Sequence, residues 1–323
     1  MFEEKLIQQA LKLAEKAANP SPNPRVGCVI WKNGKIVGKG FHVKAGESHA
    51  EIIALKQAGK AAENSTLVVN LEPCNHFGKT PPCSKAILQA GVKRVVIGMR
   101  DKSKAKGGIE FLRKNGVEVK AGICEKECRE LNQIWLKNTQ RKLPYLTLKL
   151  ALDKDGKTIP PKGKKWITGN LARKEVMQMR RKHDAILVGV NTILIDNPRL
   201  NVRGLRVEKQ PVRIVLNPNQ RDISKAKIWK EKGKNRIITR KEFPSFNLQQ
   251  ILQKLYNEGI CSILVEGGEI TAKHLLKANL VDRLEIFQHG KTTQLFSFAK
   301  GNSVESKRNF GEDILFTTLL HKY

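Results

Sequence analysis

Three residues that commonly bind metals and one acid follow each other at a spacing that suits hydrolytic zinc chemistry. His49 stands two residues before Glu51, and both Cys74 and Cys83 directly follow a proline. A catalytic zinc site has three protein ligands and a fourth position that is open to water. One histidine and two cysteines supply three ligands, so we predict a catalytic zinc ion held by His49, Cys74 and Cys83.

Glu51 is placed to move protons at this site. Zinc lowers the pKa of a bound water toward about 7, which makes a nucleophile for a ring carbon that carries an amino group. The amino group must leave as ammonia, so an acid has to carry protons from the water to the ring and to the leaving group. We predict that Glu51, near a helix start, does this without binding the metal. The order His-x-Glu, then Pro-Cys, is typical of zinc nucleobase deaminases.

A metal site must be weighed against simple burial, because cysteine is among the most buried residue types and a single histidine before a helix is commonly just exposed. The joint, ordered occurrence of the motifs favours the metal site. The other four cysteines have no such context, and we predict that they take no part in it: Cys28, Cys124, Cys128 and Cys261.

Helices and strands alternate around these motifs. Asn33-Gly34 between two apolar runs predicts a β-hairpin. The expected strands are 26–31, 35–41, 66–70, 94–98 and 117–120, and the expected helices are 3–18, 49–58, 83–90, 109–115 and 125–138. This pattern predicts an α/β domain.

A second α/β domain is expected after Arg141–Pro144. Its predicted strands are 145–151, 185–190, 212–217, 236–239, 262–266, 284–288 and 314–320, and its predicted helices are 171–182, 248–258 and 271–278. Gly267-Gly268 separates a buried strand from a helix, an arrangement that lets backbone amides meet a phosphate. A Gly-x-Gly-x-x-Gly opening is missing, which disfavours a standard Rossmann fold.

Basic residues far outnumber acidic ones, 60 Lys and Arg against 30 Asp and Glu in 323 residues, a net charge of +30. A nucleic-acid binder concentrates such charge on one face, whereas here it is spread along the whole chain. We interpret most of it as solvated surface and some as sites for anionic substrates, so nucleic acid is not an expected partner. The apolar runs are too short for a membrane helix, and the N-terminus lacks a signal-peptide pattern. We therefore expect a cytoplasmic protein.

The eight residues between Cys74 and Cys83 separate this chain from deaminases with Cys-x-x-Cys. The segment LEPCNHFGKTPPC, with PSPNPRVGCVI before it, resembles the bifunctional diaminohydroxyphosphoribosylaminopyrimidine deaminase / 5-amino-6-(5-phosphoribosylamino)uracil reductase family of bacterial riboflavin biosynthesis. The resemblance covers the chain from end to end.

The resemblance implies two activities. A cytidine-deaminase-like three-layer domain, residues 1–143, would use zinc to deaminate a pyrimidine ribosyl phosphate. A dihydrofolate-reductase-like domain, residues 144–323, would use NADPH to reduce the ribosyl group to a ribityl chain. We expect a homo-oligomer.

The resemblance also assigns site residues, partly through the motif Trp166-Ile167-Thr168 and the run from Gly189 to Arg203. In the deaminase domain, substrate contacts are expected from Asn23, Asn75 and His76, with Lys79 as an anchor for a phosphate or for its loop. In the reductase domain, Arg180, Leu200, Arg203 and Glu266 would contact substrate. The cofactor would be contacted by Ala151, Trp166, Thr192, Asp196 and Gly268.

Several segments depart from the family pattern. Asp101-Lys102-Ser103-Lys104 replaces Asp-Pro-Asn-Pro, and the stretch is shortened. Further departures are Asp153–Gly156, a lysine (Lys164 or Lys165) in place of a serine before Trp166, and the segment Gln288–Thr293. Three alternatives therefore stay open: a deaminase with a degraded reductase domain, a zinc deaminase that acts on RNA or nucleosides, and a non-catalytic zinc-stabilised RNA-binding scaffold.

Overall fold

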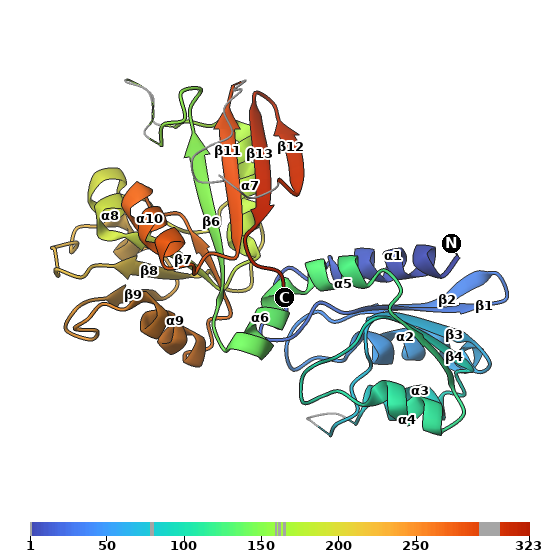
Figure 1. Ribbon diagram of the computed structural model, residues 1–323. Helices are drawn as coiled ribbons and strands as arrows, with labels where there is room; N and C mark the ends of the chain where they lie inside the picture. Colours follow the sequence, from blue (N-terminus) through green and yellow to red (C-terminus); the bar gives the residue numbers. More distant parts are fainter. Residues whose placement is uncertain (1, 78–80, 159, 161–162, 164–165, 291–303) are drawn as a thin grey trace. The chain divides into compact units, whose positions relative to one another are not determined.

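Two compact units make up the chain, residues 1–140 with Tyr323, and residues 141–322. The computed structural model describes residues 2–77, 81–158, 160, 163, 166–290 and 304–323 (Figure 1). The sequence-based assignments to Lys79, Lys164, Lys165 and residues 291–293 lie outside these described residues.

The first unit is built on a five-stranded sheet with the order β2-β1-β3-β4-β5. Strands β1 (Gly27–Lys32) and β2 (Lys35–Phe41) form the predicted hairpin. Strand β1 pairs antiparallel with β3 (Thr66–Leu71), whereas β3, β4 (Arg94–Met99) and β5 (Glu118–Ala121) are parallel. The carboxyl ends of these three strands therefore meet at one edge of the sheet.

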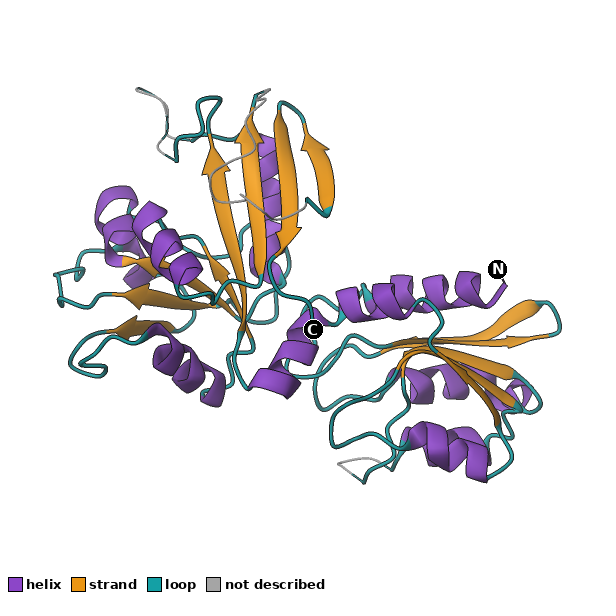
Figure 2. Ribbon diagram, in the orientation of Figure 1, coloured by secondary structure: helices purple, strands orange, loops and turns teal. Residues whose placement is uncertain are grey.

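Helices cover both faces of this sheet, which gives three layers (Figure 2). One face carries α1 (Phe2–Ala14) and α5 (Glu125–Leu131), and the other carries α2 (Ala50–Ala58), α3 (Cys83–Gln89) and α4 (Gly108–Lys114). Glycines on the strands let the helices approach closely. A Cβ on Gly27 would lie 2.0 Å from the carbonyl oxygen of Ala10 in α1, and one on Gly40 would lie 2.2 Å from that of Ala50 in α2.

The helix predicted for residues 125–138 is broken in the structure. It divides into α5 and α6 (Gln133–Arg141), with Asn132 between them. The Asn132 side chain accepts the backbone N–H of Arg25 at 2.8 Å and donates to its carbonyl at 3.1 Å. The break is thus a tertiary effect, because Asn132 serves a distant loop.

The second unit contains an eight-stranded sheet with the order β12-β13-β11-β6-β10-β7-β8-β9. Its parallel strands are β6 (Tyr145–Leu152), β7 (Ala185–Gly189), β8 (Val212–Leu216), β9 (Asn235–Ile238), β10 (Ser262–Val265) and β11 (Arg283–His289). Antiparallel pairing adds β13 (Asp313–Leu319) and then β12 (Ser306–Phe310) at one edge. The sequence pattern did not predict β12, because its residues are almost all exposed.

Two apolar cores lie against opposite faces of this sheet. Alternate residues of β6, including Leu146 and Leu148, pack with α9 (Leu248–Asn257) and α10 (Glu269–Lys277). The other face packs against α7 (Asn170–Arg181) and α8 (Val190–Asp196). No helix in the described part of the chain is long and apolar enough to span a membrane.

We expect Gly40→Ala to destabilise the first unit, because the new methyl group would collide with the backbone of α2. Overpacking of this kind costs about 1–3 kcal/mol in the free energy of unfolding. The exposed neighbour Lys39 on the same strand provides the control, since Lys39→Ala should change that free energy by less than about 0.5 kcal/mol. Urea unfolding followed by circular dichroism measures both, and equal stability of the two variants would contradict the packing argument.

Candidate metal centre and nucleotide site

The three predicted zinc ligands converge where β3 ends and where α2 and α3 begin. His49 is the N-cap residue of α2, Cys74 lies in the loop after β3, and Cys83 is the first residue of α3. The His49 Nδ1 lies 3.1 Å from the Cys83 Sγ and 3.6 Å from the Cys74 Sγ. All three donor atoms lie within 4.8 Å of one another. Ligands of a tetrahedral zinc site are roughly 3.6 Å apart, from the usual bond lengths, so this donor set fits zinc.

The two thiols differ in their protonation. The Cys83 thiol donates toward the Cys74 sulfur, and the Cys83 backbone N–H does so at 3.4 Å. Together with His49, these donors lower the pKa of Cys74 to about 4 despite its partial burial. The neighbouring Cys74 thiolate and burial raise the pKa of Cys83. One thiolate is therefore already present, and zinc binding would release the proton of the other.

Glu51 is the acid of this centre and is not one of the convergent ligands. It lies in the first turn of α2 with a side chain that is 3% exposed. Burial raises the pKa of Glu51 to about 7, although a hydrogen bond from its own backbone N–H and the nearby His49 act in the opposite direction. A carboxyl group with a pKa near neutrality can both accept and donate protons.

A histidine that the sequence analysis missed lies beside the metal ligands. His42 is buried, and its ring meets that of His49 edge-on with centroids 5.6 Å apart. Its Nδ1 faces the Ser48 carbonyl at 3.1 Å, so this nitrogen carries the proton. The Nε2 can then accept from the Asn23 side-chain amide at 2.9 Å. His42 thus links the predicted substrate residue Asn23 to the metal centre, and only its place at the end of β2 could have indicated this.

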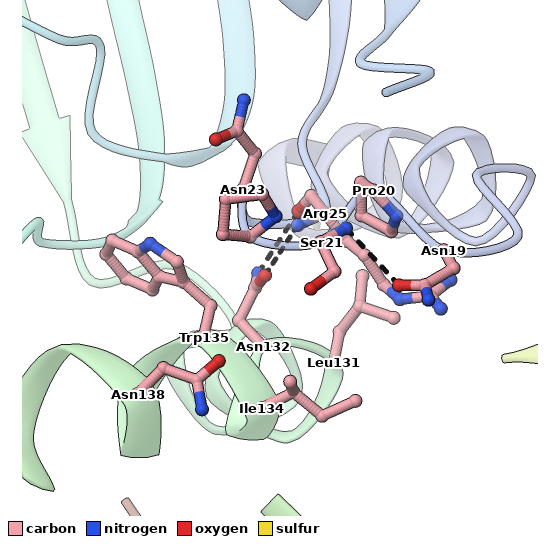
Figure 3. Close-up of a pocket in the computed structure, with 11 residues that line it drawn as sticks. Asn19, Pro20, Ser21, Asn23, Arg25, Leu131, Asn132, Ile134, Trp135 and Asn138 are labelled. Atoms are coloured by element: carbon pink, nitrogen blue, oxygen red, sulfur yellow. Dashed lines mark hydrogen bonds between the residues drawn. The ribbon is translucent and has the colours of Figure 1, made fainter. Parts of the chain in front are cut away.

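Hydrogen bonds of Arg25 fix the loop that carries Asn23. The Arg25 guanidinium donates to the carbonyls of Ala17 and Ala18, at 2.7 Å for the latter. Its backbone is bonded by Asn132, as Figure 3 shows, and its carbonyl also accepts from the Asn70 side chain. A small pocket behind the loop is lined mainly by apolar groups, among them Pro20, Leu131, Ile134 and Trp135.

Asn75 and His76 follow Cys74 and differ in their surroundings. The side-chain oxygen Oδ1 of Asn75 accepts a hydrogen bond from the Ser84 hydroxyl at 2.7 Å. This bond orients the Asn75 side-chain amide next to the metal ligand Cys74. His76 is exposed. The substrate contacts of Asn23, Asn75 and His76 stay predictions.

The second unit has a phosphate-sized cradle at the carboxyl ends of its adjacent strands β7 and β10. Gly189 ends β7, and Gly267 and Gly268 lead from β10 into α10. A Cβ on Gly189 or on Gly267 would lie 2.6 Å or 2.8 Å from atoms of Thr271, whereas one on Gly268 would find only Thr192 Oγ1, at 3.9 Å. Gly268 is exposed, so its backbone is open to a ligand. This arrangement fits the phosphates of a dinucleotide and brings the predicted cofactor residues Thr192 and Gly268 together.

Buried charges lie beside this cradle. The Arg180 guanidinium forms a two-pronged ion pair with Glu266, at 2.6 and 2.9 Å, and donates to the Asn201 carbonyl at 2.8 Å. This ion pair keeps the pKa of Glu266 below its ordinary value even though burial raises it. Lys149 of β6 interacts with Glu266, and burial lowers the pKa of Lys149. No motif predicted this lysine.

The other predicted reductase residues differ in their surroundings. Arg203 is exposed as a whole residue. Partial desolvation of its guanidinium, together with the neighbouring Arg180, lowers the pKa of Arg203. Leu200 is 2% exposed and has a positive φ of 49°. Trp166 is 53% exposed and lies under the Arg173 guanidinium. Ala151 shares one face of β6 with Lys149, and Asp196 ends α8. Their ligand contacts stay predictions.

Both halves of the chain match models of known families. Residues 1–99 match the cytidine and deoxycytidylate deaminase zinc-binding region, and residues 144–293 match the RibD C-terminal domain. The riboflavin biosynthesis protein RibD of Aquifex aeolicus is 44% identical over 302 residues, which cover 87% of this chain and 85% of that protein. The Escherichia coli RibD is 37% identical over 320 residues, 89% of this chain and 87% of that protein.

Two solved structures resemble the whole chain. Acinetobacter baumannii RibD, form 1, superposes with a TM-score of 0.86 at 32% identity, over 98% of both chains. A Thermotoga maritima diaminohydroxyphosphoribosylaminopyrimidine deaminase / 5-amino-6-(5-phosphoribosylamino)uracil reductase gives a TM-score of 0.87 at 32% identity and the same coverage.

Fold and site together define a zinc-dependent deaminase joined to an NADPH-dependent reductase in one chain. The chain belongs to the RibD family of bifunctional riboflavin biosynthesis enzymes. The predicted family, the two fold types and the two cofactors, zinc and NADPH, are thereby confirmed.

We expect the purified chain to bind about one zinc ion at the His49–Cys74–Cys83 site, because catalytic zinc needs three protein ligands. Cys83→Ser should lose most of this zinc. Cys28→Ala is the matched control, since Cys28 is equally buried but lies outside the donor set. Atomic absorption on dialysed protein measures the content, and a Cys83→Ser protein that keeps its zinc would contradict the ligand assignment.

Proposed function

We propose that the chain deaminates 2,5-diamino-6-ribosylamino-4(3H)-pyrimidinone 5′-phosphate and then reduces the ribosyl group of the product to a ribityl chain. The observation that carries this proposal is the buried Glu51 carboxyl beside three convergent zinc ligands. The Thermotoga maritima structure, whose name states both activities, supports it. We assign deamination to residues 1–143 and reduction to residues 144–323.

In the deaminase step, water replaces the amino group of a ring carbon, and ammonia leaves. Zinc, when bound by the three ligands, supplies a water of lowered pKa as the nucleophile. Glu51 takes a proton from the water and delivers protons to the ring nitrogen and to the departing amino group. Its burial suits this shuttle, because a carboxyl group with a pKa near 7 is present in both forms. His42 orients Asn23, which we assign to hold the pyrimidine ring.

In the reductase step, the sugar C1 carbon gains a hydride, its bond to the sugar ring oxygen breaks, and that oxygen takes up a proton from water to become a free hydroxyl group. NADPH, when bound at the Gly267-Gly268 turn, supplies the hydride. Arg180 keeps Glu266 ionised and fixed in direction. We assign Glu266 and Lys149 to the polar groups of the sugar and the pyrimidine ring, since both are half-buried charged residues that interact with each other.

We also propose a cytoplasmic homo-oligomer. Size-exclusion chromatography with light scattering tests the assembly, and a monomeric mass at micromolar concentration would contradict it.

Glu51→Gln should separate the two activities. The substitution keeps the size of the side chain but removes its acid, so ammonia release should fall by about 10²–10⁴-fold. Zinc content should stay unchanged, and NADPH oxidation should persist when the deaminated compound is supplied. Loss of zinc from this variant would show that Glu51 supports the metal site, which contradicts its role as a proton carrier.

Gly268→Val should weaken NADPH binding without harm to the fold. The position has an ordinary φ of −67° and open space around its Cβ, so the valine can be accommodated by the protein. It would fill the space that a cofactor phosphate must enter. We expect about tenfold weaker binding or more, which corresponds to about 1.4 kcal/mol, as measured by NADPH fluorescence. Deaminase activity of the same sample is the control, and unchanged NADPH affinity would place the cofactor elsewhere.

A further inference from the structure

The loop after β4 carries three lysines at alternate positions. Lys102, Lys104 and Lys106 are exposed, whereas the intervening Ser103 and Ala105 are half-buried. Within the described residues, none of the three lysines forms an ion pair. Nearby Glu110 faces Arg100 instead, at 3.3 Å. The loop therefore presents three charges to solvent over five residues.

Buried acids hold this loop in one conformation without neutralising its lysines. The Glu72 carboxylate is 5% exposed and accepts backbone N–H groups of Asp101, Gly107 and Ile109 at 3.0 to 3.2 Å. Asp101 in turn accepts the backbone N–H of Ser103 at 2.6 Å. Both carboxylates thus bind main-chain donors. A loop fixed in this way loses little conformational entropy when it binds a ligand.

The same loop borders the deaminase site. The Ala105 carbonyl accepts the backbone N–H of Asn75 at 2.9 Å, and Asn75 directly follows the metal ligand Cys74. A Cβ on Gly107 would lie 3.5 Å from the Asn75 side-chain nitrogen. Lys104 and Lys106 are the immediate neighbours of Ala105. Their amino groups are on long flexible stems, so they can reach groups at the rim of the site.

We propose that Lys102, Lys104 and Lys106 bind the 5′-phosphate of the substrate at the rim of the deaminase site. This inference rests on the proposed function, which puts the pyrimidine at the zinc centre and a doubly charged phosphate several bonds away. Three unpaired cations on a fixed loop next to that centre complement such a phosphate. Lys102 and Lys104 stand in the segment that departs from the family pattern, and Lys106 follows it directly.

The test compares two triple variants that each lower the net charge from +30 to +27, by removal of three positive charges. One is Lys102→Gln, Lys104→Gln and Lys106→Gln. The control is Lys5→Gln, Lys12→Gln and Lys16→Gln, which changes exposed lysines on and just after α1, the helix that covers the opposite face of the sheet from α2 and α3. The two triple variants therefore have the same net charge and the same long-range attraction for a negatively charged ligand.

Binding is measured in the full chain with Glu51→Gln, to prevent turnover, and with cobalt(II) in place of zinc. The visible absorption of cobalt reports ligands at the metal centre only, so binding to the reductase unit does not interfere. The probes are the diaminopyrimidinone ribosyl phosphate and the same riboside without phosphate. We expect the loop variant to bind the ribosyl phosphate at least about tenfold more weakly than the unsubstituted loop does, which corresponds to about 1.4 kcal/mol. Its affinity for the riboside should be unchanged. The control should bind both normally, and the loop effect should shrink at high salt.

Three results would overturn the proposal: no loss of affinity in the loop variant, equal loss in the two triple variants, or equal loss for the riboside. The proposed function is tested separately by ammonia release from the zinc protein with Glu51 intact. If that protein releases no ammonia but the loop variant still binds the ribosyl phosphate more weakly, the proposed function is contradicted and the proposed phosphate site is supported.

Discussion

Parallel strands that end side by side are the constraint on which both sites depend. The carboxyl ends of neighbouring parallel strands meet at one edge of a sheet, and the loops that follow them have to converge there. In the first unit this edge brings Cys74, after β3, next to the loop after β4. In the second unit it brings Gly189, the last residue of β7, against Thr271, which follows β10. Chemistry is added by a few residues in these loops, and the sheets supply the rigid support.

Residues in ordered motifs could be predicted from the sequence, whereas isolated polar residues could not. His49, Glu51, Cys74 and Cys83 identify themselves by type and spacing, and Gly267-Gly268 by its place between a strand and a helix. His42, Glu72 and Lys149 belong to strands or strand ends, where one polar residue carries no periodic signal. Their partners are distant in the chain: His42 bonds Asn23, and Glu72 bonds residues 101–109.

Local patterns also failed where tertiary contacts decide the backbone. Residues 125–138 have the periodicity of one helix, but Asn132 satisfies the backbone of Arg25 and the helix divides there. Strand β12 has almost no buried residue, so it lacks the alternation that predicts a strand, and its pairing with β13 supplies the hydrogen bonds. At Asn132 a hydrogen bond to a remote segment outweighs local preference, whereas β12 is held by the strand that follows it directly in the chain.

The buried ion cluster of the second unit needs an explanation other than stability. Transfer of Arg180 and Glu266 out of water has a desolvation cost, so a well-packed apolar pair at these positions would stabilise the fold at least as well. Their pairing, at 2.6 and 2.9 Å, keeps a carboxylate charged in the interior. The half-buried Lys149 adds a further charge next to Glu266. Such a concentration beside a nucleotide cradle is typical of a binding site, which argues for a functional reductase unit.

Two of the segments that depart from the family pattern in this unit are hydrogen-bonded to each other. Gln288 donates to the Asp153 carbonyl at 2.6 Å, so two departing segments are bonded together. His289 bonds Asp313 at 2.8 Å, and Asp313 also accepts the backbone N–H of Gly169 at 2.7 Å, where α7 begins. Asp153 accepts the backbone N–H groups of Asp155 and Lys157, which closes its own turn. Asp153, His289 and Asp313 thus have polar partners, whereas the buried Gln288 Oε1 has none among the described residues. These contacts join β6, β11 and the start of α7, and this order argues against a degraded reductase domain.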